Sequence, residues 1–145
     1  MKNISEQLIK IVEETSIILN GISQDDWNYR SASGKWTKKE ILGHLIDSAA
    51  NNHQRFVRVQ FEDNPTITYD QNKWVLTEDF NNASSDNLIS LWKSYNKHLA
   101  HIISTMPKDK YNNHCDIRKE QPVTIEWIIK DYIRHLEHHL NQIIK

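Results

Sequence analysis

The stretch that decides the fold is Trp36-Thr37-Lys38-Lys39-Glu40-Ile41-Leu42-Gly43-His44-Leu45-Ile46-Asp47-Ser48. The Thr37 hydroxyl can accept a hydrogen bond from a free amide of the first helical turn, while the Glu40 carboxylate reaches back to the Thr37 amide. This pattern is a capping box, which marks the start of a helix. The helix is predicted to run to about Phe61, before Pro65.

Three further long helices are predicted from apolar residues that recur three and four positions apart. They run from about Ser5 to Asn20, from Ser84 or Ser85 to about Thr105, and from about Thr124 to Ile144. Residues 23–27 are expected to form one capped turn, and the connector 62–82 a turn of helix around Trp74. Only three glycines and three prolines occur, which is typical of long helices and not of a β-rich fold. The sequence therefore predicts an all-α fold, a four-helix bundle forming a single domain over residues 1–145.

Composition excludes several classes of partner. The formal net charge is −1 over 145 residues, so no overall field favours nucleic acid or an anionic membrane. No apolar run approaches the roughly 20 residues that span a bilayer, and the first residues do not resemble a signal peptide. The lone Cys115 cannot form an internal disulfide, which fits a reducing compartment. Its Asn-rich surroundings offer no fixed base, which favours an ordinary loop thiol over the alternative of a catalytic cysteine. We expect a cytoplasmic protein that acts on a small molecule, without nucleic-acid or membrane partners.

Histidines supply the candidate functional residues. His135 and His139 are four residues apart, so on a helix they share one face and can bind one metal ion. On the helix that begins at Thr37, a polar stripe lies about a quarter-turn from the apolar arc; it consists of His44, Ser48, Asn51 and Arg55. Such a stripe either faces solvent or walls a cavity. Periodicity alone favours ordinary surface or core roles for these histidines.

Other motif readings fail on geometry. The last helix contains HLEHH, which is not the HExxH of zinc proteases, and Glu137 lies about 200° around the helix from His135. His98 and His101 form another pair, three residues apart, but a neighbouring lysine indicates a solvated face. The chain has no GxGxxG, Walker loop or GxSxG elbow, so nucleotide cradles and serine hydrolase chemistry lack support.

Several runs nevertheless carry a family resemblance: Trp36 to Ser48, Arg55-Phe56, Glu62-Asp63-Asn64-Pro65, Tyr69-Asp70, Trp74, and Tyr132 to Leu140. Together they resemble the DinB-like superfamily, and within it the YfiT-like branch. That branch is described as metal-dependent hydrolases and includes bacillithiol S-transferases. The resemblance spans nearly the whole chain from about Trp27 onward.

The resemblance implies a four-helix bundle, usually a homodimer, with a divalent nickel or zinc ion as cofactor. Carried over position by position, the implied ligands are His44, His135 and His139. The sequence departs from the branch at Ala49 and Gln142, where the branch commonly has histidines. Neither position is an implied ligand, so the departures bear on the substrate and not on metal binding.

Three neutral imidazoles would leave a divalent ion with an open position, as in catalytic sites. A water or thiol bound there would ionise more easily, so both a hydrolase and a thiol S-transferase acting on a small electrophile are consistent with this ligand set. The expected pocket residues, which could also contact a low-molecular-weight thiol, are Asp47, Ser48, Asn51 and Arg55. Arg55 could bind a carboxylate of such a thiol or be solvated or paired, and Asp131 could orient His135 or be an ordinary surface residue. No general base is assigned, and a non-catalytic bundle that binds metal or a protein partner is the alternative.

Overall fold

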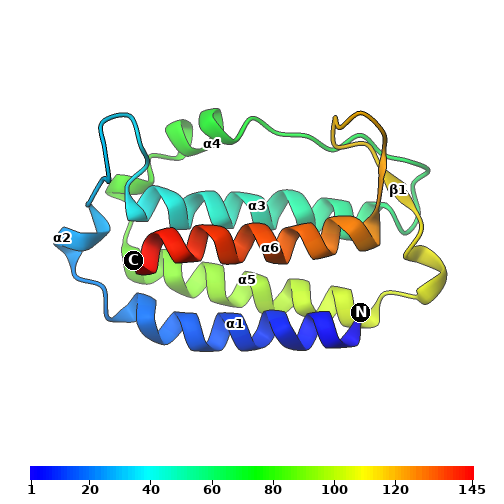
Figure 1. The fold of residues 1–145 in the computed structure, drawn as a ribbon, viewed down its shortest axis with the longest axis horizontal. Helices are drawn as coiled ribbons and strands as arrows, with labels where there is room; N and C mark the ends of the chain where they lie inside the picture. The colour runs from blue at the N-terminus through cyan, green and yellow to red at the C-terminus, as the bar shows by residue number, and fades with distance from the viewer.

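A computed structural model describes all residues 1–145. Four long helices lie side by side along the length of the molecule (Figure 1). They are α1 (Lys2–Asn20), α3 (Lys38–Arg58), α5 (Ser85–Thr105) and α6 (Ile125–Ile144). Helix α5 packs against α1 and α3, and α3 also packs against α6. The predicted four-helix bundle is confirmed.

Side-chain caps begin the helices where the sequence predicts them. Thr37 Oγ1 accepts from the Glu40 amide at 3.1 Å and Glu40 Oε2 accepts from the Thr37 amide at 2.7 Å, so the capping box is present. The Ser84 side chain caps α5 by accepting from the Asn87 amide, and the Thr124 side chain caps α6 by accepting from the Trp127 amide. The boundaries differ by three residues at two ends, since α1 begins at Lys2 and α3 ends at Arg58.

The core is continuous along the bundle. Its largest fully buried side chains come from all four long helices and from α2 (Gln24–Trp27), the short capped turn that the sequence predicts. Among them are Trp27, Trp92, Phe56, Leu8, Leu42 and Leu136. Removal of these apolar surfaces from water is the main stabilising contribution to the bundle.

The connector between α3 and α5 lies along α3, and we call residues 62–83 the strap. It contains α4 (Gln71–Glu78) and η1 (Phe80–Asn82), both packed on α3 (Figure 1). The Phe80 ring lies so close to Gly43 that a Cβ atom there would meet it at 2.1 Å. Around Trp74, where the sequence predicts one helical turn, the structure has the eight-residue helix α4, which packs on α3.

The loop between α5 and α6 holds the elements that the sequence did not predict. After η2 (Lys108–Lys110), the strands β1 (His114–Cys115) and β2 (Val123–Thr124) form a short antiparallel pair. Cys115 is fully buried and its Sγ lies 3.2 Å from the Pro65 carbonyl oxygen, which is the hydrogen-bond acceptor. The interpretation of Cys115 as an ordinary loop thiol is corrected: it is a core residue of a strand, and burial raises the pKa of its thiol.

None of the helices is both long enough and apolar enough to cross a bilayer.

Candidate metal centre

Helices α3 and α6 bring three histidines together. His44 lies on α3, and His135 and His139 lie one turn apart on α6. One potential ligand atom from each lies within 4.8 Å of the other two, and His44 Nε2 is 3.1 Å from His135 Nε2. These are the three histidines that the resemblance implied as ligands.

Burial keeps these imidazoles neutral. Removal from water, reinforced by the nearby His135 and His139 rings, lowers the pKa of His44 to about 3. Burial likewise lowers the pKa of His135 to about 4 and lowers that of His139. A neutral imidazole keeps the nitrogen lone pair that binds a metal ion, so the site is prepared for a cation.

Two neighbouring side chains position the histidines. Gln142 Oε1 lies 2.8 Å from His139 Nδ1, which makes Nδ1 the donor and leaves the lone pair on Nε2. The Trp36 ring covers the group, with its centroid 4.9 Å from that of His44 and 6.5 Å from that of His139. Sequence reasoning had treated Gln142 as a departure from the family and Trp36 only as part of a signature.

The donor set fits a divalent transition metal. Three nitrogen donors from rigid helices match zinc or nickel sites, in which imidazole is a common ligand. His44 Nδ1 is buried without a hydrogen-bond partner, so this ring has polar capacity that the protein alone does not satisfy. The donor set therefore fits a divalent ion, which His44, His135 and His139 would hold.

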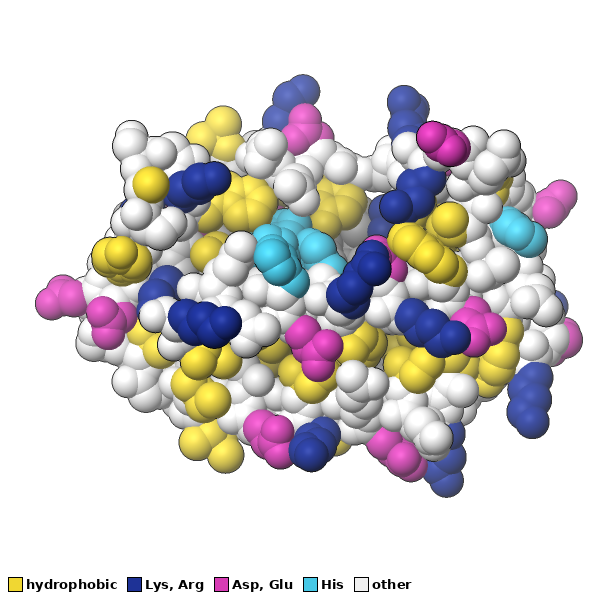
Figure 2. Space-filling model, viewed as in Figure 1, with side chains coloured by type: hydrophobic (Ala, Val, Ile, Leu, Met, Phe, Trp, Pro, Cys, Tyr) yellow, Lys and Arg dark blue, Asp and Glu magenta, His cyan; other side chains and the backbone are white.

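A cavity of about 490 Å³ opens beside the histidines. It is bounded by the loop before α3, the first turns of α3, the start of α4 and the end of α6. Its lining residues are Tyr29, Ser31, Gly34, Lys35, Trp36, Lys38, Ile41, Asn72, His139 and Gln142. In the space-filling view, histidine side chains gather near the middle of the face formed by α3 and α6, with basic side chains around them (Figure 2). The cavity gives a small molecule access to His139.

The four pocket residues expected on α3 lie elsewhere. Asp47, Ser48 and Asn51 are buried, but none of them lines the cavity. The Arg55 guanidinium donates to the Ile67 carbonyl from Nε at 3.2 Å and from Nη2 at 3.0 Å, so it secures the strap to α3. Of the roles expected for Arg55 from the sequence, the structure shows pairing within the protein, with the Ile67 carbonyl.

Two carboxylates near the site behave differently. Burial, reinforced by the nearby Glu78 carboxyl, raises the pKa of Asp47 to about 8. Asp131 pairs with Arg134 and makes no hydrogen bond to His135, although its charge opposes the lowering of the His135 pKa. Asp131 therefore acts on His135 through charge and not by direct orientation.

The bundle and its histidine centre define a class of helical protein with an interhelical candidate metal site. The family model of the DinB superfamily matches residues 7–143, and the chain belongs to that superfamily.

Relatives support the same grouping. A protein of Oceanobacillus iheyensis named "putative metal-dependent hydrolase" is 30% identical over 139 residues, covering 95% of this chain and 78% of that protein. A Bacillus subtilis protein with the same description, YfiT, is 27% identical over 125 residues, covering 83% of this chain and 68% of its own. The predicted YfiT-like resemblance is confirmed.

Solved structures show the same fold. The structure of Bacillus subtilis YfiT, described as "a probable metal-dependent hydrolase with an unusual four-helix bundle topology", matches with a TM-score of 0.83 at 21% identity, covering 96% of this chain and 83% of that one. A mycothiol-dependent maleylpyruvate isomerase matches with a TM-score of 0.79 at 13% identity, covering 99% of this chain and 60% of that one.

Proposed function

We propose that this protein is a metal-dependent enzyme in which His44, His135 and His139 hold a divalent ion, nickel or zinc, and a small electrophile reacts with a thiol or with water. The observation that carries the proposal is the convergence of three neutral ligand groups within 4.8 Å beside an open cavity. The name of the Oceanobacillus iheyensis relative supports metal dependence. The mycothiol dependence of the isomerase with the same fold supports a thiol co-substrate.

A divalent ion bound by three histidines would offer an open position at which the pKa of a water or thiol falls. The protein's own residues provide the rest of the environment. Gln142 fixes the ring orientation of His139, and Trp36 excludes water from one side of the histidines. The cavity between the loop before α3 and the end of α6 holds the substrate.

Thiol transfer and hydrolysis can be separated with simple reagents. Protein reconstituted with zinc or nickel is supplied with 1-chloro-2,4-dinitrobenzene and a low-molecular-weight thiol, bacillithiol or 2-mercaptoethanol, or with 4-nitrophenyl acetate without a thiol. Accelerated loss of the free thiol supports transfer, and accelerated release of 4-nitrophenol without a thiol supports hydrolysis.

The control is a pair of variants. His44→Ala should bind less than stoichiometric metal and lose either activity, while His98→Ala should keep both metal and activity. Stoichiometric metal in both proteins, without any rate above that of the free metal ion, would favour a non-catalytic metal-binding bundle. Absence of bound metal in the wild type after reconstitution would overturn the proposal.

A further inference from the structure

The cavity beside the histidines has a one-sided charge. Lys35 and Lys38 are among the residues that line it, and no aspartate or glutamate does. Neither lysine side chain makes a hydrogen bond or an ion pair within the protein. By contrast, the nearby Lys39 is buried and donates to the carbonyls of Asn81 and Ala83 at 3.2 and 3.1 Å. The two cavity lysines are therefore free to bind an external anion.

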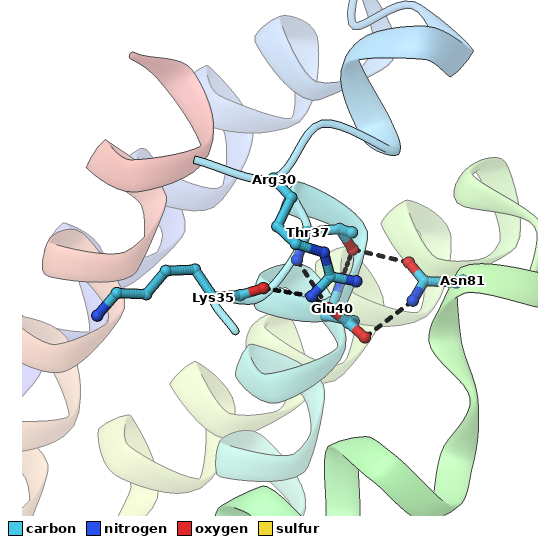
Figure 3. Close-up of polar contacts among 5 residues, drawn as sticks. All are labelled: Arg30, Lys35, Thr37, Glu40 and Asn81. Atoms are coloured by element: carbon cyan, nitrogen blue, oxygen red, sulfur yellow. Dashed lines mark hydrogen bonds and ion pairs between the residues drawn. The ribbon is translucent and has the colours of Figure 1, made fainter. Parts of the chain in front are cut away.

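The loop that carries Lys35 is held in place. Arg30 forms a backbone bridge with Thr37, donates to the Lys35 carbonyl and pairs with Glu40 at 3.4 Å. Thr37 Oγ1 and Glu40 Oε1 in turn bond the side-chain amide of Asn81, at 2.7 and 2.8 Å. Figure 3 shows the Lys35 side chain pointing away from this network.

A positive φ of 77° at Gly34 allows the turn that precedes Lys35. The network and this turn hold the Lys35 backbone in position, so only the side chain has to be ordered when a ligand binds. That lowers the entropic cost of binding.

Hydrogen-bonding groups accompany the charges. Ser31, Tyr29 and Asn72 also line the cavity, and each can donate to an oxygen atom. The cation that the sequence had suggested for this task, Arg55, is committed to the Ile67 carbonyl. Among the residues that line the cavity, Lys35 and Lys38 are the permanent cations.

We propose that this cavity selects substrates with a carboxylate group, which Lys35 and Lys38 bind while the reacting end of the molecule lies at His139. The idea deepens the proposed function, because the position of the reacting end rests on the metal centre, but binding of the carboxylate does not. A partly exposed ammonium group binds a carboxylate with a charge-assisted hydrogen bond, and two such groups act together.

Binding at the metal is tested with three thiols of similar size and different charge. Cobalt(II)-substituted protein is titrated with 3-mercaptopropionate, 2-mercaptoethanol and cysteamine, and the thiolate-to-cobalt absorption gives each Kd. The test variant is Lys35→Gln/Lys38→Gln. The control, Lys10→Gln/Lys73→Gln, removes the same charge at exposed positions outside the cavity. Comparison of wild type with variant for each thiol cancels the different intrinsic acidities of the thiols.

We expect the Lys35→Gln/Lys38→Gln variant to weaken 3-mercaptopropionate binding about tenfold, to change 2-mercaptoethanol binding less than twofold, and to strengthen cysteamine binding. A change of about tenfold corresponds to about 1.4 kcal/mol. The control variant should change none of the three by more than about twofold. Equal weakening of all three thiols, or the same result from the control variant, would overturn the carboxylate assignment and leave the thiol-binding metal centre intact.

A second measurement does not depend on the metal. Metal-free, ¹⁵N-labelled protein is titrated with succinate and with inorganic phosphate, and the amide shifts of residues 29–38 are followed. Saturable shifts with succinate that disappear in Lys35→Gln/Lys38→Gln support the carboxylate site, even where no thiol binds cobalt and the thiol chemistry fails. Shifts with phosphate alone, or with neither anion, contradict it.

Discussion

Two groups of histidines in this bundle follow the same plan, and only one is a candidate metal centre. In each, α3 contributes one histidine and a neighbouring helix contributes two. His44 meets His135 and His139 of α6, whereas on the other side of α3 His53 lies near His98, which is followed by His101 on α5. Only the first group brings three ligand atoms within 4.8 Å of one another.

Burial and competing partners separate the two groups. His98 and His101 are exposed, and their ring centroids are 6.5 Å apart, against 4.5 Å for His135 and His139. His53 Nδ1 is already engaged with the Tyr95 hydroxyl at 3.0 Å. Helical spacing alone therefore does not distinguish the candidate metal centre: what sets it apart is a third histidine, His44, that is buried and close to the other two and has a ring nitrogen without a protein partner.

The largest expected effect is on metal affinity. His139→Ala should weaken zinc binding at least about 100-fold, since loss of a mere supporting partner of a ligand already costs about 10–100-fold. His98→Ala removes an imidazole from the other group and should leave the zinc Kd within about twofold. Competition with a chromophoric chelator measures both. Equal loss in the two variants would abolish the distinction between the groups.

Substitution of a hydrogen-bond partner should likewise weaken zinc binding in the first group of histidines and not in the second. Gln142→Ala frees His139 Nδ1 and is expected to weaken zinc binding about tenfold, because the ring is no longer held with Nε2 facing the site. The matched change in the other group is Tyr95→Phe, which removes the hydroxyl near His53 and should not alter the zinc Kd. A Gln142→Ala protein with wild-type affinity would show that Gln142 does not orient the ligand.

Acid should destabilise the metal-free protein because His44 is buried in its neutral form. The pKa of His44 is about 3 in the folded protein but near 6.5 in the unfolded chain, so the unfolded state binds more protons between these values. The free energy of unfolding therefore falls as pH decreases below 6.5, by at most about 1.4 kcal/mol per pH unit for one histidine.

Asp47 acts in the opposite sense. Its carboxyl pKa is raised to about 8, so the folded state keeps a proton that the unfolded chain loses near pH 4, and stability falls as pH rises between these values. Urea unfolding of wild type and His44→Gln at several pH values isolates the histidine, because Asp47 is common to both. Below pH 6.5 the free energy of unfolding of the variant should fall less steeply with decreasing pH than that of the wild type, by up to about 1.4 kcal/mol per pH unit. An unchanged slope would contradict a neutral His44.

The smallest effect is expected at the exposed end of the second group. His101→Ala should change the free energy of unfolding by no more than about 0.5 kcal/mol, as is usual for surface substitutions. The hydrogen bonds near it are accepted by the His101 backbone carbonyl from Ser104 and Thr105, and they survive the substitution. A loss above about 1 kcal/mol in thermal or urea unfolding would show that the second group is structural.

Sequence reasoning succeeded where the determinants are local. The capping box of Thr37 and Glu40 and the serine and threonine caps of α5 and α6 act within one helical turn, so the bundle could be predicted from neighbouring residues. The set of three histidines required the family resemblance, because its members are 91 residues apart in the case of His44 and His135.

The surroundings of the site could not be read from the sequence because they depend on packing between distant segments. Arg55 faced the expected side of α3, but the strap supplies a carbonyl that engages it. Trp36 covers His44, and Lys35 lines the cavity because the loop before α3 folds back. The long separation in sequence between Trp36 and His139 gave no signal of their contact. Gln142, by contrast, lies three residues after His139 and four after His138, a helical spacing that could have suggested a contact.

The Phe80 ring occupies the space that a side chain at residue 43 would need. Mutational tolerance along α3 is consequently uneven: in a saturation library selected for folding, almost every substitution of Gly43 should disappear, while the solvent-facing Gln54 on the same helix should accept most replacements. A selected Gly43→Ala protein should reappear only together with a smaller residue at position 80, such as Phe80→Leu. The contact thus ties the evolution of the strap to a single missing methyl group.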